Sequence, residues 1–344
     1  MMKISSVKTY AVRVLLAVFL IALFAFSSLS PGIAGDRVTL TVSLQPYISY
    51  APIFIAMEEG YFEEQGLEIE LFKVRGSEQA VPALARGDLD VGTHSIGSNL
   101  FAAVSRGIQL KIVADKGHLE KRCNYVAIMV RKDLYDKGEL VSVKQLRGRK
   151  IAVSAIPTLG YIYETILSTG GLTLDDVEIV RIPVSSKIEA LETGAIDAAS
   201  AVEPQITQWS DLGYAVPLFK YEDFFSEYQV TSIIFGPRLT EQNPELGKKF
   251  MVAYLKGVRQ YNRGKTERNM EIFQKYTGLD VDILKKICLP SISPDGHVHT
   301  ESILAVQDWA YEKGFIDSKV SLDRLVDMSF VEHANRILEQ TEDN

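Results

Sequence analysis

The fold is decided by the stretch Pro46-Tyr47-Ile48-Ser49-Tyr50-Ala51-Pro52-Ile53-Phe54-Ile55-Ala56, with Glu59-Gly60-Tyr61-Phe62 shortly after it. An apolar strand is expected before this stretch, at Val38–Leu44, and a second strand after it, at Leu67–Val74. The stretch therefore joins the carboxyl end of a strand to the start of a helix. Open α/β sheets bind small molecules at that edge, because free backbone N–H groups of the helix hold polar ligand atoms there.

The rest of the chain continues this alternation, which predicts βαβ units and parallel sheets. The expected strands are Val38–Leu44, Leu67–Val74, Leu89–Gly92, Gln109–Ala114, Tyr125–Val130, Lys150–Ser154, Val177–Pro183, Ile196–Ala201, Ala215–Phe219 and Ser232–Phe235. The expected helices are Ala51–Gln65, Ser77–Arg86, Ser98–Arg106, Leu159–Thr169, Ser185–Thr193, Pro204–Leu212, Pro244–Asn262, Glu267–Thr277, Val281–Ile287, Thr300–Lys313 and Leu322–Met328. The charged stretch 115–122 is expected to be irregular, and the last third of the chain mostly helical.

The first 34 residues are typical of a secretory signal peptide and are not expected to belong to the fold. Lys3, Lys8 and Arg13 form a basic start, the run Val14–Phe26 is apolar, and small residues follow up to a cleavage site near Ala34. The apolar run is shorter than the roughly 20 residues that span a bilayer comfortably. An uncleaved membrane anchor is the alternative. The sequence therefore predicts export to the periplasm.

Composition narrows the class of protein. The chain holds 37 Lys and Arg against 44 Asp and Glu, and three of the basic residues lie in the predicted signal, which leaves 34 against 44, a formal charge of −10. Nucleic-acid binding is not expected, because it depends on neutralising phosphates. About 310 residues are enough for two lobes. The only cysteines, Cys123 and Cys288, either form one disulfide or remain free thiols.

One segment of the sequence occurs twice. The stretch Ala83-Leu84-Ala85-Arg86-Gly87-Asp88-Leu89-Asp90-Val91 matches Ala190-Leu191-Glu192-Thr193-Gly194-Ala195-Ile196-Asp197-Ala198 in its pattern. Each copy predicts a helix end, a capping glycine and a short apolar strand that carries an aspartate. Either two α/β units use the same favourable turn, or each lobe contains the same strand–helix unit with pockets that face one another.

Several short motifs follow one another between about Leu40 and Phe235. They are Ala51-Pro52-x-Phe54-x-Ala56 with Gly60-Tyr61-Phe62, the first copy of the repeat with Thr93-His94-Ser95, Leu146-Arg147-Gly148-Arg149-Lys150-Ile151-Ala152-Val153, Leu167-Ser168-Thr169-Gly170-Gly171-Leu172 with Asp176-Val177, and Glu203-Pro204. In these motifs and in their order along the chain, the sequence resembles the NMT1/THI5-like periplasmic binding proteins of nitrate, sulfonate, taurine and thiamine-precursor transport. The resemblance implies the α/β, two-lobed type II periplasmic binding protein fold with a helical C-terminal extension. Lobe one would comprise residues 36–120 plus 232–344, and lobe two residues 121–231.

Under that topology, the candidate ligand-binding residues are those at strand ends and helix starts that face the cleft. They are Tyr47, Tyr50, Gly76, Ser77, Thr93, His94 and Ser95 from lobe one, Thr158, Gly160, Tyr161 and Glu203 from lobe two, and Tyr228 near the returning crossover. Aromatic faces suit a planar or apolar ligand body, and hydroxyl and N–H groups hold its polar edge. Alternatively, the tyrosines cap the sheet edge, the serines are N-caps, and Glu203 caps the helix that follows it. Tyr161 is preferred to Tyr163, because both cannot point inward from one short helix start.

The expected ligand is neutral or partly cationic and contains a ring, as a pyrimidine-type thiamine precursor does. Sulfonate-binding family members resemble one another in a Gly- and Ser/Thr-rich turn at the first helix of lobe two, whereas this chain has Ala155-Ile156-Pro157-Thr158-Leu159-Gly160. Pro157 removes one N–H donor, Arg and Lys are sparse at the cleft positions, and Glu203 disfavours an anion. Arg75 or Lys187 reaching into the cleft would reverse this expectation.

No sequence motif indicates catalysis. The chain lacks a GxSxG elbow, a Walker loop and an HExxH motif, so no catalytic residue, cofactor or metal site is predicted. His297 and His299 beside Asp295 are interpreted as a polar loop cluster and not as metal ligands.

The resemblance implies a solute-binding component of an ABC importer, a monomer that delivers a small-molecule ligand to a membrane permease and its ATPase. The alternatives are a two-lobed sensor that feeds a signalling partner, a binder of sulfonate- or nitrate-type oxyanions, and a THI5-type pyrimidine synthase. The last resembles a cytosolic design with a Cys-rich motif, which two isolated cysteines and an export signal do not match.

Overall fold

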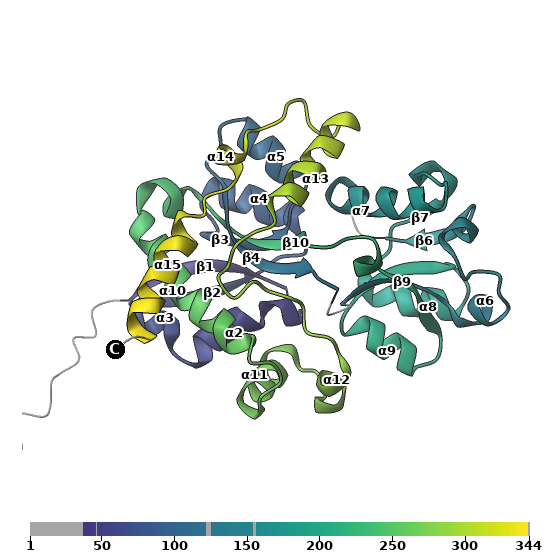
Figure 1. Cartoon of the computed structure of the whole chain (residues 1–344), viewed down its shortest axis with the longest axis horizontal. Coiled ribbons are helices and arrows are strands. Elements are labelled where there is room, and N and C mark those ends of the chain that lie inside the picture. The colour runs from purple at the N-terminus through teal and green to yellow at the C-terminus, as the bar shows by residue number, and fades with distance from the viewer. Residues whose placement is uncertain (1–36, 46, 122–124, 154–155, 343–344) are drawn as a thin grey trace, which may run out of the picture. The chain divides into compact units, whose positions relative to one another are not determined.

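A computed structural model describes residues 37–45, 47–121, 125–153 and 156–342. The predicted signal segment and Cys123 lie outside these residues. Residues from Val38 onward form one unit, which contains two five-stranded sheets (Figure 1). Within the described ranges, no helix is both long enough and apolar enough to cross a bilayer. Cys288 is disulfide-bonded, so the free-thiol alternative is wrong for this residue.

The first sheet has the strand order β2-β1-β3-β10-β4. Its strands are β1 (Val38–Leu44), β2 (Leu67–Lys73), β3 (Val91–Ser95), β4 (Lys111–Leu119) and β10 (Tyr228–Phe235). Strand β1 pairs in parallel with β2 and β3, whereas β10 runs antiparallel to β3 and β4. The carboxyl ends of β1 and β3 therefore lie at one edge of the sheet, where α/β proteins place their ligands.

The second sheet repeats this arrangement with the order β7-β6-β8-β5-β9. Its strands are β5 (Val126–Arg131), β6 (Lys150–Ala152), β7 (Glu178–Val180), β8 (Ala198–Val202) and β9 (Ala215–Lys220). Strand β6 is parallel to β7 and β8, and β5 is antiparallel to β8 and β9. The chain passes from the first sheet to the second after β4 and returns after β9. These two passages correspond to the two crossovers between lobes that the family resemblance implies.

The helices cover both faces of the sheets. They are α2 (Ala51–Glu58), α3 (Tyr61–Glu64), α4 (Ser77–Arg86), α5 (Ser98–Ser105), α6 (Lys132–Asp136), α7 (Ile156–Thr169), α8 (Lys187–Glu192), α9 (Gln205–Asp211), α10 (Pro244–Tyr261), α11 (Glu267–Thr277), α12 (Val281–Lys286), α13 (Thr300–Glu312), α14 (Leu322–Leu325) and α15 (Ser329–Glu342). Figure 1 shows α4, α5 and α13 on one side of the first sheet, and α2, α10 and α15 on the other. Side chains of a strand alternate between faces, so Ile234 of β10 packs with the first group while Ile233 and Phe235 pack with the second.

The repeated segment occupies the same position in both sheets. The first copy joins α4 to β3, the second joins α8 to β8, and each of these strands is third in the order of its sheet. Asp90 Oδ2 accepts a hydrogen bond from the backbone N–H of Thr41 on β1 at 2.9 Å, and Asp197 Oδ2 accepts one from that of Lys150 on β6 at 3.0 Å. The two aspartates therefore fasten the second strand in the order of each sheet to the third, which favours the interpretation as one strand–helix unit in each lobe.

Three sequence-based expectations are wrong. The helix expected over Ala51–Gln65 is broken at Gly60, whose φ of 73° is left-handed, so α2 and α3 are separate. The stretch expected to be irregular continues β4 as far as Leu119, because this part of the strand pairs with β10. Helix α15 was not expected at all; it packs against α10 at the C-terminal end of the chain.

Candidate ligand-binding site

A cavity of about 290 Å³ is lined by residues at strand ends of both sheets and at the starts of the helices that follow these strands. Its volume is at the lower end of the range of small-molecule sites. The predicted residues that line it are Tyr47, Tyr50, Gly76, Ser77, Thr93, His94, Ser95 and Glu203. Further polar and aromatic residues on its walls are Gln45, Ser49, Arg75, Glu78, Lys116, Tyr125, Tyr163, Lys187, Ser200, Gln205, Tyr221 and Thr231. Ligand contact by any of them stays a prediction.

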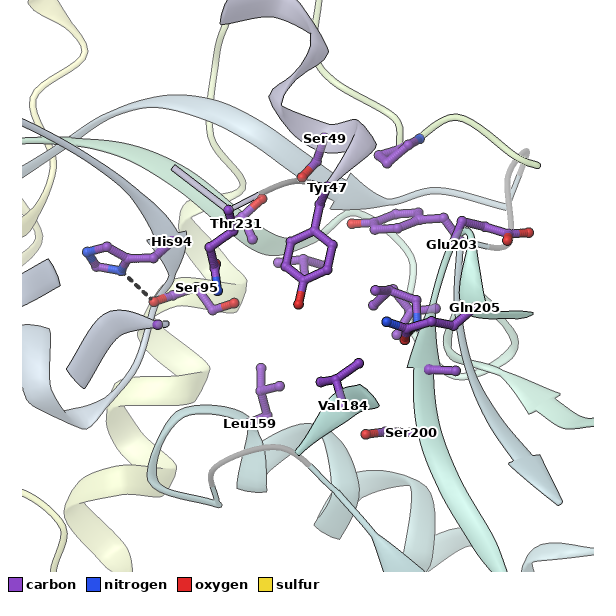
Figure 2. A pocket seen from close by; sticks show the side chains of 18 of the residues that line it. Tyr47, Ser49, His94, Ser95, Leu159, Val184, Ser200, Glu203, Gln205 and Thr231 are labelled. Carbon is purple, nitrogen blue, oxygen red and sulfur yellow. Dashed lines mark hydrogen bonds between the residues drawn. The ribbon is translucent and has the colours of Figure 1, made fainter. Parts of the chain in front are cut away.

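Tyr47 lies nearest the middle of the cavity. It sits in the loop between β1 and α2, directly before the short 3₁₀ helix Ile48–Tyr50. Figure 2 shows its ring extending across the cavity, with the hydroxyl directed toward Leu159 and Val184 on the opposite wall. Burial raises the pKa of Tyr47, so its hydroxyl stays neutral and can both donate and accept a hydrogen bond. The side chain is half-buried, which suits a ring that stacks on a planar ligand.

Tyr50 and Thr93 form the floor of the site on the side of the first sheet. The Tyr50 hydroxyl donates to the Thr93 carbonyl at 2.7 Å, and the Thr93 hydroxyl donates to the Ser43 carbonyl at 2.7 Å. Burial raises the pKa of Tyr50 further above its ordinary value. These hydroxyls are already satisfied within the protein, so Tyr50 can offer its ring to a ligand but has little spare hydrogen-bonding capacity.

His94 is a neutral, buried imidazole at the end of β3. Its Nδ1 lies 3.0 Å from the Ser95 carbonyl, a hydrogen bond that is drawn in Figure 2. Burial lowers the pKa of His94 to about 4. The neutral ring therefore donates from Nδ1, and its Nε2 has no hydrogen-bond partner among the described residues.

The start of α4 brings Gly76 and Ser77 to the wall. The first N–H groups of a helix have no acceptor within the helix, and the positive end of the helix dipole favours negative ligand atoms. This is the role that the sequence predicts for the loop–helix junctions of the first sheet.

Two buried lysines line the cavity, one associated with each sheet. Lys116 of β4 is 1% exposed, and its Nζ lies 3.0 Å from the Ser49 hydroxyl. Lys187 at the start of α8 is 2% exposed, and its Nζ donates to the Ser200 carbonyl at 2.9 Å. Burial lowers the pKa of Lys187 to about 8. Arg75 lies on the exposed rim of the same cavity. Arg75 and Lys187 thus line the cavity, which is the arrangement that would reverse the expectation of a neutral or cationic ligand. The charge of the ligand stays a prediction.

Glu203 lines the cavity, but its carboxylate is engaged elsewhere. It accepts hydrogen bonds from the backbone N–H of Thr207 at 3.2 Å and from the Thr207 hydroxyl at 3.0 Å. Figure 2 shows the carboxylate directed away from Tyr47. Burial raises the pKa of Glu203 despite these bonds. The capping interpretation fits this geometry better than direct ligand contact, so Glu203 is a poor argument against an anion.

Three further predicted residues, Gly160, Tyr161 and Tyr228, do not line the cavity. Tyr161 and Tyr228 stack on each other with ring centroids 6.1 Å apart, and Gly160 is buried within α7. Tyr163 lines the cavity in place of Tyr161, so the preference between these two was wrong. The side chain of Thr158 lies outside the described residues.

Lys116 is the main site residue that sequence reasoning missed. It comes two positions after the apolar run Ile112-Val113-Ala114, in a stretch expected to be irregular because of its charges. A signal was present: a strand that reaches the carboxyl edge of a sheet places its last side chains at the ligand site.

Comparison with known proteins agrees with this geometry. The family model described as NMT1/THI5 like matches residues 47–262, more than half of the chain. The chain belongs to this family. Among curated relatives, a putative aliphatic sulfonates-binding protein of Bacillus subtilis is 22% identical over 313 residues, which are 88% of this chain and 91% of that protein.

Solved structures confirm the fold of this NMT1/THI5-like protein. The alkanesulfonate-binding protein SsuA of Xanthomonas axonopodis pv. citri, bound to MOPS, superposes with a TM-score of 0.68 at 18% identity, covering 86% of this chain and 100% of that one. The periplasmic nitrate-binding protein NrtA of Synechocystis PCC 6803 gives 0.71 at 13% identity, with coverages of 90% and 91%. The predicted family and the two-lobed α/β periplasmic binding protein fold with its helical C-terminal region are therefore confirmed.

Proposed function

We propose that this protein is the solute-binding subunit of an ABC importer, which captures a small ring-containing ligand and delivers it to a membrane permease and its ATPase. The observation that carries the proposal is the cavity of about 290 Å³, whose walls are aromatic rings and hydroxyls from both sheets. Two chain passages join the sheets, as hinge closure around a ligand requires. The predicted export signal and the acidic charge fit a protein that works in the periplasm.

The wall chemistry supports a ring in the ligand. Tyr47 extends across the cavity (Figure 2), and the rings of Tyr50, Tyr125, Tyr163 and Tyr221 line it. Aromatic side chains bury large apolar areas and favour offset stacking on planar groups. The sparse basic residues and Glu203 no longer disfavour an anionic ligand, because Lys187 lines the cavity and Glu203 bonds to Thr207. We therefore still expect a ligand that contains a ring, but we no longer expect it to be neutral or cationic.

The same walls support binding without a chemical reaction. Nucleophilic catalysis needs a nucleophile within hydrogen-bond reach of a base. Among the described wall residues, the imidazole of His94 bonds only to the Ser95 carbonyl, and the carboxylate of Glu203 bonds to Thr207. Neither group activates a hydroxyl or an amine on the wall, so we expect the ligand to leave unchanged.

We expect the purified protein to be stabilised by a small ring compound in a thermal-shift screen. The panel pairs ring acids with their neutral amides and adds nitrate and pyrimidine thiamine precursors. A ligand at 100-fold over its dissociation constant stabilises by roughly 2.7 kcal/mol. The binder is then recovered and analysed by mass spectrometry, and recovery of an altered compound would favour the synthase alternative. No stabilisation by any member of a panel this broad counts against the proposal.

We expect the Tyr47→Ala variant to bind the ligand from this screen at least tenfold more weakly. A ring at the centre of a binding site contributes on the order of 2 kcal/mol or more, and this substitution leaves the loop backbone unchanged. The measurement is isothermal titration calorimetry. Tyr135→Ala is the matched control, since Tyr135 is 40% exposed and does not line the cavity. Equal affinity of the two variants would show that Tyr47 does not contact the ligand.

A further inference from the structure

Lys116 carries a buried amine with few partners inside the protein. Its Nζ donates to the Ser49 hydroxyl at 3.0 Å and lies 3.6 Å from the centre of the Tyr50 ring. An ammonium group has three donors, and one hydroxyl and one aromatic face satisfy them only in part. Within the described part of the chain, no carboxylate oxygen lies within ion-pair distance of this Nζ. Burying such a group is costly unless something else pairs with it.

The neighbouring carboxylate does not fill this role. Asp115 precedes Lys116 on β4, and its two oxygens accept hydrogen bonds from the Gly117 N–H, His118 Nδ1, Gln229 Nε2 and the Ser293 N–H. Successive side chains of a strand point to opposite faces. Asp115 therefore acts on Lys116 through its charge and not through a direct bond, while the Lys116 side chain faces the cavity.

The other titratable groups nearest to Lys116 place no carboxylate beside its Nζ. Tyr50 lies beneath its Nζ, and both Tyr50 and Tyr47 are neutral phenols. His94, also on the cavity wall, is neutral. On the side of the second sheet the wall carries Lys187, a second buried amine without a carboxylate partner among the described residues. Two carboxylates also line the cavity: Glu78 is exposed in the first turn of α4, and Glu203 accepts hydrogen bonds from Thr207. Within the described residues, neither lies within ion-pair distance of the Lys116 Nζ, so this amine has room for an anionic partner from a ligand.

We propose that the ligand of this cavity is a small organic acid, and that Lys116 selects it by binding the acidic group as an ammonium ion and taking up a proton as it does so. This inference rests on the proposed function and names the charge of the ligand and a residue that recognises it. Lys187 is a second cation for the same ligand, held by the Ser200 carbonyl in the opposite wall.

The titration of Lys116 supports this inference and fixes its sign. Burial lowers the pKa of Lys116 to about 7, although the charge of Asp115 opposes this. Above pH 7 the amine of the free protein is therefore mostly neutral. A bound anion favours the charged form, so binding takes up a proton. Affinity for a permanently charged anion should be level below pH 7 and should fall above it, by at most about tenfold per pH unit.

The test uses benzenesulfonate as the probe, because its charge does not change from about pH 6 to about pH 9. Benzenesulfonamide is the neutral counterpart. Calorimetric titration in two buffers of different ionisation enthalpy gives both the dissociation constant and the number of protons taken up. We expect benzenesulfonate to bind at least tenfold more weakly at pH 9 than at pH 6, with proton uptake in between, and benzenesulfonamide to bind weakly at every pH.

The variant Lys116→Met keeps the length of the side chain and removes its charge. We expect it to fold, because an apolar group in place of a buried, unpaired charge is neutral or stabilising. It should bind benzenesulfonate at least tenfold more weakly at pH 6 and lose most of the proton uptake near pH 7.5. Lys187→Met should weaken binding but keep this uptake, and Lys249→Met, on the exposed face of α10, should behave as the unmodified protein does.

Each other outcome has a defined meaning. Unchanged proton uptake in Lys116→Met, or an affinity that does not vary with pH, overturns the role of Lys116. Binding of neutral ring compounds in preference to acids overturns the ligand class and leaves solute binding intact. If no compound in the screening panel or either probe binds, the proposed function fails and the inference falls with it.

Discussion

Replacing Asp115 with alanine is expected to lower the free energy of unfolding by about 3–5 kcal/mol, because it removes a buried carboxylate and leaves its partners unpaired. Asp115 is completely buried. Its bonds join three parts of the chain: β4 itself through Gly117 and His118, β10 through Gln229, and a later loop through Ser293. Strands β4 and β10 each adjoin a chain passage between the sheets, so the substitution should destabilise the junction of the two lobes.

Urea denaturation measures this loss, with an unchanged slope as the check that the unfolding transition is comparable. Asp88→Ala is the matched control: Asp88 is exposed and its carboxylate pairs with Arg86, and such surface pairs contribute about 0–1 kcal/mol. A loss at Asp115 no larger than the loss at Asp88 would contradict the role assigned to it.

The difference between wild type and Asp115→Ala should also depend on pH. Burial lowers the pKa of His118, but the hydrogen bond to Asp115 and its charge outweigh burial and raise it above the ordinary value. A raised pKa contributes stability that is fully present below the unfolded pKa of His118 and is lost as the pH rises through the folded value. The variant lacks this contribution. The loss should therefore be larger at about pH 5.5 than at about pH 8.5, and the reverse order would argue against the His118–Asp115 pair.

The strands and helices around the site could be predicted because their signals are local. The helix Ser77–Arg86 was predicted with its observed bounds, since an amphipathic run ends at a glycine that adopts a positive φ. Strand Val38–Leu44 was predicted in the same way from its apolar pattern. The extension of β4 to Leu119 could not be, because the charged residues in it are buried only by pairing with β10, more than 100 positions later in the chain.

The position of the site at the edge of the sheet could be predicted better than the side chains that line it. Tyr47 and His94 were found because Tyr47 follows β1 and His94 is among the last residues of β3, and backbone topology alone brings such positions to the cavity. The direction of a side chain depends instead on contacts that are distant in sequence. Tyr161 and Tyr163 are two residues apart on α7, so they point to opposite sides of the helix. Which of them faces the cavity is settled by Tyr228, which stacks on Tyr161.

The second large effect is the loss of stability expected for Gly257→Ala, at a close contact between two helices. Gly257 lies in α10 where this helix packs on α2, and a Cβ added there would lie 2.2 Å from the Pro52 carbonyl oxygen and 3.2 Å from the Ala56 Cβ. The first contact is with backbone and cannot be relieved by a rotamer change, so α2 and α10 must separate. Overpacking of this kind costs typically 1–3 kcal/mol and more where backbone must move. Alanine recovers only about 1 kcal/mol through its better helix propensity.

We therefore expect Gly257→Ala to lower the free energy of unfolding by about 3 kcal/mol. Lys249→Ala, an exposed position on the same helix, should change it by less than about 0.5 kcal/mol. The same displacement should reach the ligand site, because α2 begins at Ala51, directly after Tyr50. Ligand affinity of the folded variant, measured by calorimetry at low temperature, should fall with stability. If Gly257→Ala has the same urea midpoint as the wild type, α2 and α10 can accommodate a Cβ at this position, and the close contact described here does not limit the packing of the two helices.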